Sequence, residues 1–391
     1  MKCIINGRII LPNQILDGMA VLFDKTIIDI IEQDEVKNYV ELEIIDAAGK
    51  FVSPGLIDVH IHGFQGDDSS DGDLEGIRRI SKALLENGVT GWLPTTITIE
   101  KSLIVKALET IREGKKLSTE GKEAWQGAQV LGCHVEGPFI NPNKKGAQPE
   151  EYILKPDAKF VKEFADVISI ISMAPEMDEN FEFIKEVTRD TDVVVSMGHT
   201  DATYETAVAA VEAGVSHVTH LFNAMSALNH RKPGVVAAAL NTDVATELIV
   251  DTFHIHPGLF SLIDKIKGDK LCLITDCLRA GGLADGEYTL GGQKFVLKGI
   301  ECRLEDGTIA GSVLRLNQGV KNVMKYTDMP MWQVVAAASL NPAKSIGLAA
   351  TKGSLENGKD ADIIITDEDY NVEQTFIRGE LYYNTISHKK Q

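Results

Sequence analysis

Positive charge is in short supply in this sequence. Its 391 residues include 57 acidic side chains against 39 lysines and arginines, which gives a formal net charge of −18 at pH 7. A strongly acidic chain is repelled by nucleic acid and by anionic lipid, so we expect neither as a partner. A small anionic substrate is still compatible with this balance, because such a molecule responds to the charge near its own site.

Cysteines and long apolar runs are also scarce. The five cysteines include no Cys-x-x-Cys pair, which argues against a disulfide framework and indicates a reducing cytoplasm. The first residues, Met-Lys-Cys-Ile-Ile-Asn-Gly-Arg, are broken by polar residues and lack the pattern of a signal peptide. No apolar run reaches membrane-spanning length. These absences predict a soluble, cytoplasmic protein without a membrane partner.

The middle of the chain alternates between apolar, strand-like segments and segments with helical patterning. The strand candidates are residues 52–62, 88–95, 130–137, 167–174, 193–198, 217–222, 246–251 and 270–276. About eight such units in roughly 300 residues match the size and rhythm of a (β/α)8 TIM barrel. A doubly wound open sheet is the alternative, but no Gly-x-Gly-x-x-Gly motif follows any of these segments.

Short strand-like segments with turn signals fill both ends of the chain. Asn6-Gly7 and Asp17-Gly18 are typical of hairpin turns, and a second β-rich stretch begins near Gly353. Because chain ends often lie close together, we expect one small β domain from residues 1–51 and 349–391, beside an α/β barrel domain at 52–348. The longer connections 142–156 and 278–304 are expected to be substrate loops.

Candidate ligands for a metal ion stand at the C-terminal ends of different predicted strands. They are His60 and His62 after the first, Glu136 after the third, His199 after the fifth, His220 after the sixth and Asp276 after the eighth. In a barrel these ends gather at one mouth, and nitrogen and oxygen ligands suit Zn, Fe, Mn or Co. Each residue alone also fits a structural role, such as a helix cap or a half-buried histidine. Their common placement favours a metal site.

Eight motifs then point to one family. They are Pro54-Gly-Leu-Ile-Asp-Val-His-Ile-His-Gly, Leu131-Gly-Cys-His-Val-Glu-Gly-Pro-Phe, Lys145-Gly-Ala, Gly198-His-Thr-Asp-Ala, Thr219-His-Leu-Phe-Asn-Ala-Met, Arg231-Lys-Pro-Gly, Ile274-Thr-Asp and Leu290-Gly-Gly. Almost from end to end, the chain resembles the N-acetylglucosamine-6-phosphate deacetylases of the amidohydrolase superfamily. That resemblance implies a (β/α)8 barrel with a β-sandwich built from both chain ends, in agreement with the strand pattern.

The resemblance also implies an activity and roles for single residues. The expected reaction is metal-dependent hydrolysis of the acetamide of N-acetyl-D-glucosamine 6-phosphate to D-glucosamine 6-phosphate and acetate, in amino-sugar catabolism. Glu136, His199 and His220 match the main metal triad, and Asp276 matches the catalytic aspartate. Residues at substrate-contacting positions are Ala147, Asn223, Ala224, Arg231, His254, Ile309, Ala310, Gly311 and Ser312. The family is typically dimeric, so we expect a homodimer in which His254 serves the neighbouring subunit's site.

One departure within the family concerns the number of metal ions. Some members replace His-x-His by Gln and Asn, bind one metal, and use a histidine after Lys-Gly-x to polarise the acetyl carbonyl. Here His60 and His62 are both present, whereas that later position is Gln148. We hypothesise that a second metal near the two histidines compensates for the missing histidine. The oxyanion is expected to contact Gln148, with His134 nearby.

Other functions stay open at this point. An N-acetylgalactosamine-6-phosphate deacetylase is barely distinguishable by sequence from the favoured enzyme. A dihydroorotase or a D-amino-acid deacylase would share the metal site, but these commonly use a carboxylated lysine after the fourth strand, and residues 168–176 contain none. A non-catalytic scaffold on the same fold would be expected to have lost ligands, whereas all six candidate ligands are present in this sequence.

Overall fold

Eight parallel strands form the centre of the computed structural model, which describes residues 1–385. In sheet order they are β8 (Leu56–Ile61), β11 (Val89–Thr96), β13 (Cys133–Glu136), β14 (Ile168–Met173), β15 (Val194–Met197), β16 (His217–Val218), β17 (Ala245–Ile249) and β18 (Leu271–Ile274). The ring closes where Asp276 N donates to His60 O over 2.9 Å and Ile61 pairs with Cys277 in parallel. The predicted barrel is confirmed, with each strand close to its expected place.

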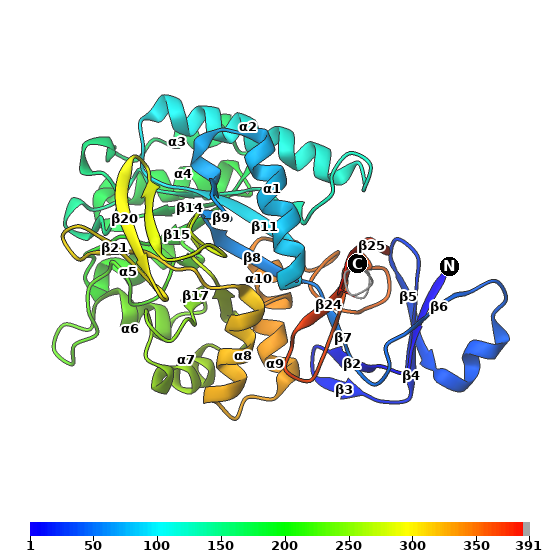
Figure 1. The fold of residues 1–391 in the computed structure, drawn as a ribbon. Helices are drawn as coiled ribbons and strands as arrows, with labels where there is room; N and C mark the ends of the chain where they lie inside the picture. Colours follow the sequence, from blue (N-terminus) through cyan, green and yellow to red (C-terminus); the bar gives the residue numbers. More distant parts are fainter. Residues whose placement is uncertain (386–391) are drawn as a thin grey trace.

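Helices surround the barrel as an outer layer (Figure 1). They are α1 (Leu74–Leu84), α2 (Lys101–Thr119), α3 (Ala158–Glu163), α4 (Glu182–Asp190), α5 (Tyr204–Ala213), α6 (Gly234–Asn241), α7 (Phe260–Lys267), α8 (Leu316–Tyr326), α9 (Met331–Ala337) and α10 (Leu340–Ser345). The first of them shows why they form: Asp73 caps the N-terminus, and Ile77, Ile80 and Leu84 recur at helical spacing and are buried. Each helix therefore covers the strands with its apolar face.

Two sheets from the chain ends pack face to face. One has the order β5 (Ile27–Glu32), β4 (Met19–Phe23), β1 (Lys2–Ile5), β6 (Glu43–Asp46), and the other β25 (Glu380–Asn384), β24 (Val372–Ile377), β23 (Ile363–Thr366), β7 (Phe51–Pro54), β2 (Arg8–Leu11), β3 (Gln14–Leu16). Val21 and Phe23 of the first share a buried core with Ile363 and Phe376 of the second. The β-sandwich is confirmed, and Figure 1 shows it beside the barrel.

The exact division between the two parts stays a prediction. Strand β7 spans the expected boundary between residues 51 and 52, and it pairs with β2 and β23 of the six-stranded sheet. At the other end, residues 386–391 of the expected range 349–391 lie outside the described residues.

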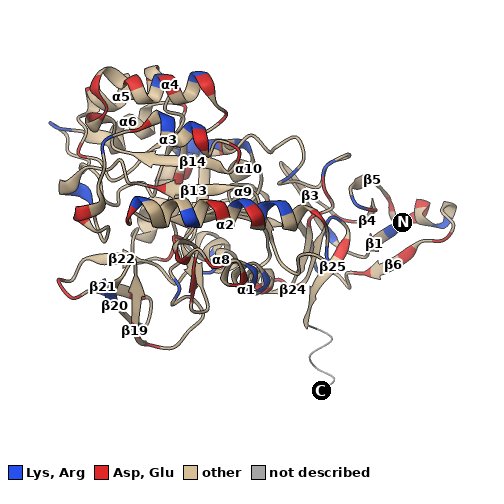
Figure 2. Cartoon of the chain, turned by 90° about the horizontal axis from the view of Figure 1, so that it is seen from above, with Lys and Arg blue, Asp and Glu red and all other residues tan. Residues whose placement is uncertain are grey.

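The expected substrate loop at residues 278–304 contains strands. Together with the residues that follow, it forms a four-stranded antiparallel sheet of β19 (Gly286–Leu290), β20 (Gln293–Lys298), β21 (Glu301–Leu304) and β22 (Ile309–Gly311). This sheet lies on the opposite side of the barrel from the β-sandwich (Figures 1 and 2). It is joined to the other long connection, because Gln293 Nε2 donates to Ala147 O over 2.7 Å.

Charges of both signs are spread over the outside of the molecule. Figure 2 shows basic and acidic residues alternating along α2, in keeping with a solvated face. Among residues 1–385, no helix combines the length and apolarity that crossing a membrane requires.

Candidate active site

The candidate ligands lie at the C-terminal ends of the barrel strands, as expected. His60 belongs to β8 and Glu136 ends β13, while His199, His220 and Asp276 follow β15, β16 and β18 within two residues. These last three residues have positive φ values of 48°, 28° and 50°. Such values are uncommon for residues other than glycine, although His and Asp are among the more tolerant. The chain therefore turns sharply at each of these three strand ends.

Glu136, His199 and His220 form one compact group. Oε1 of Glu136 lies 3.1 Å from His199 Nε2 and 2.9 Å from His220 Nε2, and the two imidazole nitrogens are 3.1 Å apart. His199 Nδ1 faces the carbonyl oxygen of Lys144 at 2.9 Å, which fixes the plane of the ring.

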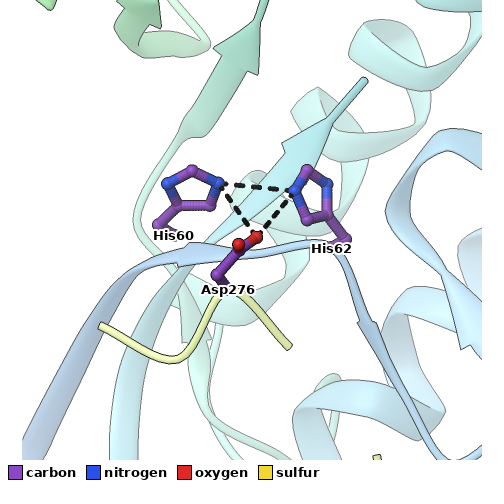
Figure 3. Close-up of side chains that lie close together, drawn as sticks. All are labelled: His60, His62 and Asp276. Carbon is purple, nitrogen blue, oxygen red and sulfur yellow. Dashed lines mark hydrogen bonds and ion pairs between the residues drawn. The ribbon is translucent and has the colours of Figure 1, made fainter. Parts of the chain in front are cut away.

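His60, His62 and Asp276 form a second group (Figure 3). Oδ1 of Asp276 lies 3.5 Å from His60 Nε2 and 3.2 Å from His62 Nε2, and the two nitrogens are 3.4 Å apart. Nδ1 of His62 is 3.2 Å from the carbonyl oxygen of Thr95, so its Nε2 faces the group.

Glu136 lies between the two groups. Its Oε1 is 3.4 Å from His60 Nε2, and its Oε2 is 3.5 Å from His62 Nε2. The Glu136 carboxylate thus lies close to all four imidazoles and joins the two groups into one cluster at the barrel mouth.

These donor sets fit divalent cations. Two pairs of imidazole nitrogens approach each other within 3.4 Å, and the ligand atoms of each group lie within 4.8 Å of one another. Imidazole nitrogens and carboxylate oxygens are the ligands that Zn, Fe, Mn and Co take in proteins. The types and spacing of these ligand atoms are therefore compatible with one or two bound divalent cations.

The carboxylates and imidazoles of the two groups shift each other's pKa values. Burial lowers the pKa of His62, but the hydrogen bond to Asp276 and the charge of Glu136 outweigh it and raise the pKa to about 9. Burial raises the pKa of Glu136, yet the neighbouring His199 and His220 hold it well below its usual range. Glu136 is therefore an anion, as a metal ligand must be.

His134, which was expected near the oxyanion, is not among the residues that line the cavity. Its ring is fully buried behind His60, with Nδ1 2.9 Å from Val59 O and Nε2 2.6 Å from Ser172 Oγ. Both ring nitrogens therefore have partners inside the barrel, and the side chain packs behind the ligand candidates.

A cavity of about 260 Å³ opens above the two groups, with His62, Glu136, His199, His220 and Asp276 among its lining residues. Most of the expected substrate residues line it as well: Ala147, Asn223, Ala224, His254, Ile309, Ala310 and Gly311. His254 lies in the cavity of its own chain, and its Nδ1 is 2.7 Å from Asp251 Oδ2. A single chain therefore supplies this histidine to its own site.

Two expected substrate residues lie elsewhere. Arg231 is exposed and lines a separate surface depression with Lys144 and Asp201. Ser312 is buried, and its Oγ donates to Thr275 O while its backbone N–H donates to Asp276 O. Ser312 therefore holds the strand end that carries Asp276 and does not itself reach the cavity.

Gln148 lies at the cavity wall with its amide fixed at both ends. Its Nε2 donates to Glu136 Oε2 over 2.6 Å, and its Oε1 accepts from the backbone N–H of Thr98 over 2.5 Å. An amide nitrogen carries two hydrogens, so one N–H remains for a ligand.

Several residues at the site were not found by sequence reasoning. Ile97 and Thr308 line the cavity but carry no chemical signature in the sequence, and Leu290 begins a motif without having been assigned to the site. Glu247 lies beneath the site, with Oε2 2.8 Å from His60 Nδ1. One signal could have identified it: a lone carboxylate in the buried strand Ala245-Thr-Glu-Leu-Ile.

Comparison with known proteins places the chain in a family. Residues 51–382 match the model of the amidohydrolase family. An N-acetylglucosamine-6-phosphate deacetylase of Bacillus subtilis is 39% identical over 381 residues, 96% of this chain and 95% of the relative. An N-acetylgalactosamine-6-phosphate deacetylase of Escherichia coli O157:H7 is 33% identical over 88% of this chain and 90% of the relative.

Solved structures agree with these relatives. The crystal structure of an N-acetylglucosamine-6-phosphate deacetylase from Pasteurella multocida covers 98% of this chain and 100% of its own, with a TM-score of 0.91 and 32% identity. With this agreement in sequence and fold, the chain belongs to the amidohydrolase family.

Proposed function

We propose that this protein hydrolyses the acetamide of N-acetyl-D-glucosamine 6-phosphate to D-glucosamine 6-phosphate and acetate. The observation that carries the proposal is the convergence of Glu136, His199, His220 and Asp276 on one cavity. The full-length similarity to deacetylases of this substrate supports the same conclusion. A non-catalytic scaffold is disfavoured because every expected metal ligand is present.

A divalent cation is the cofactor that these residues would hold, with Zn, Fe, Mn and Co as the candidates and one or two ions per chain. Glu136, His199 and His220 would hold one ion, and His60, His62 and Asp276 a second. When bound, such an ion supplies Lewis acidity that polarises a carbonyl and lowers the pKa of water.

Asp276 is the proposed proton carrier. Its Oδ1 faces His62 from the cavity floor, where its carboxylate can accept a proton from the attacking water. The same carboxyl then protonates the sugar nitrogen as the C–N bond breaks, because an amine leaves poorly unless it is protonated. One residue thus serves as base and then as acid.

Gln148 is the proposed donor to the oxyanion. Its remaining N–H can stabilise the negative charge that develops on the acetyl oxygen, and its bonds to Glu136 and Thr98 hold that donor in place before reaction. A preorganised amide needs no reorientation when the charge develops.

The phosphate end requires donors at the other side of the cavity. The Asn223 N–H donates to His220 O, whereas within residues 1–385 the Ala224 N–H has no protein partner and can serve the phosphate. His254 can present Nε2, since its Nδ1 is held by Asp251. The resemblance to the deacetylases also places Arg231 at a position that holds the sugar phosphate, and we propose this role for it. We further propose a homodimer, which light scattering of the purified protein would test.

The C4 epimer is the alternative substrate, and the similarity to the Escherichia coli relative named above favours its inclusion. A dihydroorotase or D-amino-acid deacylase is disfavoured because β14 (Ile168–Met173) contains no lysine.

Acetate release from both 6-phospho-sugars, measured with elemental analysis of the protein, tests the proposal. We expect metal-dependent release with a higher kcat/KM for the gluco sugar; no release from either sugar by metal-loaded protein would refute it.

A further inference from the structure

Glu247 is a carboxylate in the interior of the barrel with no contact to solvent. It lies in the middle of β17, in a strand that is buried throughout. A buried carboxylate is costly unless it is hydrogen-bonded or paired, so its partners indicate what it does.

Both partners of its Oε2 are ligand candidates from different groups. Oε2 lies 2.8 Å from Nδ1 of His60 and accepts the backbone N–H of His220 over 3.0 Å. The carbonyl oxygen of Glu247 also accepts the N–H of Leu221. Glu247 therefore contacts a side chain of one metal group and the backbone of the other.

The contact with His60 fixes which ring nitrogen faces the site. A carboxylate oxygen at Nδ1 accepts a hydrogen bond from the Nδ1–H group, so this tautomer has its lone pair on Nε2. That Nε2 atom lies 3.5 Å from Asp276 Oδ1. Carboxylates that orient metal-ligating histidines in this way raise their basicity and fix the ring.

The contact with His220 restrains an unusual backbone conformation. His220 has a φ of 28°, and the two hydrogen bonds from residues 220 and 221 to Glu247 tie this turn to β17. Such conformations persist where surrounding contacts determine them.

We propose that Glu247 is a positioning residue that orients His60 for metal binding and fixes the strand end that carries His220. The other oxygen, Oε1, has no hydrogen-bond partner within residues 1–385, and it lies 3.7 Å from His134 Nδ1 and 3.8 Å from His217 Nδ1. The hydrogen bonds of the Glu247 side chain are therefore made by Oε2. This inference rests on the proposed assignment of His60 as a metal ligand.

Metal binding to the metal-free protein tests the inference without using activity. Co²⁺ is titrated into wild type, Glu247→Leu and Glu247→Gln by calorimetry, with His60→Asn defining the part of the isotherm that depends on His60. We expect Glu247→Leu to weaken that part about 10- to 100-fold, as for other carboxylates behind metal ligands. Glu247→Gln should stay close to wild type, because its amide oxygen still accepts from His60.

Thr246→Val is the matched control. Thr246 is a buried neighbour on the same strand, and within residues 1–385 its hydroxyl bonds only to Val244 O, so the variant perturbs β17 without touching either metal group. Its isotherm should match wild type. If Glu247→Leu does not fold, the shorter Glu247→Asp takes its place, because it cannot span the distance to His60.

The outcomes separate the inference from the proposed function. A Glu247→Leu isotherm equal to wild type, with His60→Asn impaired, would overturn the inference and leave the site assignment intact. A His60→Asn isotherm equal to wild type would instead remove His60 from the metal site. Imidazole ¹⁵N spectra of the metal-free protein give a second reading: we expect the Nδ1–H tautomer at His60, and the Nε2–H tautomer would contradict the assigned hydrogen bond.

Discussion

Gln148 Nε2 donates to Oε2 of Glu136 over 2.6 Å, so the candidate oxyanion donor is bonded to the residue that both metal groups share. Gln148→Ala removes this donor and leaves the Thr98 N–H without its acceptor. We expect kcat to fall roughly 100-fold, as for loss of an oxyanion donor, with the metal content unchanged. Gln148→His keeps an N–H donor and should retain more activity. Unchanged kcat in Gln148→Ala would exclude the residue from catalysis.

The paired substitution His60→Gln/His62→Asn tests whether a second metal compensates for the absent histidine. Removing two imidazoles from the group in Figure 3 should remove one equivalent of bound metal and lower the rate. Introducing Gln148→His into this background should recover part of the rate. Elemental analysis and acetate release are the measurements, and an unchanged metal count and rate in the double variant would eliminate the hypothesis.

Asp276→Asn should nearly abolish turnover. An amide cannot accept the proton of water or deliver it to the leaving nitrogen, and such proton transfers contribute about 10²- to 10⁴-fold. Metal at Glu136, His199 and His220 should be retained, because that group does not include Asp276. Acetate release and elemental analysis on the same preparation separate the two effects. Near-normal activity would refute the assigned role.

Phosphate recognition can be divided between His254 and Arg231 by comparing phosphorylated and unphosphorylated sugars. We expect His254→Ala and Arg231→Ala each to raise KM for the 6-phosphate about 10-fold or more, the effect of losing a charged hydrogen bond. KM for the unphosphorylated sugar should change little. Because Arg231 is exposed outside the cavity, an Arg231→Ala enzyme with unchanged KM would remove it from the phosphate site.

Asp58 should make the stability of the metal-free protein depend on pH. Burial raises the pKa of its carboxyl to about 7 from 3.8, despite hydrogen bonds from Thr275 and the His60 N–H. Between these two values the folded state holds a proton that the unfolded chain releases, so stability falls as pH rises from about 4 to about 7.

Thermal unfolding of wild type and Asp58→Asn from pH 4.5 to 8 measures this effect. The neutral amide has no proton to lose, so the variant should gain in Tm relative to wild type as the pH rises. Parallel curves over the whole range would show that Asp58 does not titrate in this window.

Sequence patterns predicted the barrel, the sandwich and the six metal-ligand candidates because each depends on local regularities. The strand segments are apolar and evenly spaced, and the ligand candidates stand at their C-terminal ends. Because these ends meet at one face of a TIM barrel, the fold alone brings the candidates together. The sheet β19–β22 escaped prediction because its glycine-rich, solvent-facing segments resemble loops. Arg231 was assigned by resemblance and His134 by its spacing to Glu136, but whether a side chain faces the cavity depends on tertiary packing.

Glu247 shows a further limit of sequence reasoning. Nothing near it in the chain indicates that it meets His60, because that contact joins residues 187 positions apart. Only closure of the barrel brings β8 and β17 close enough for the two side chains to pair.

Glu136 contacts both metal groups through one carboxylate, and this makes their loading interdependent. An ion in either group would fix the carboxylate and remove rotamer freedom that the other group would otherwise have to restrict. Thermodynamic reciprocity then requires each ion to change the affinity for the other by the same factor. Occupancy of one half of the site should therefore alter the metal affinity of the other half, because both depend on the position of the same carboxylate.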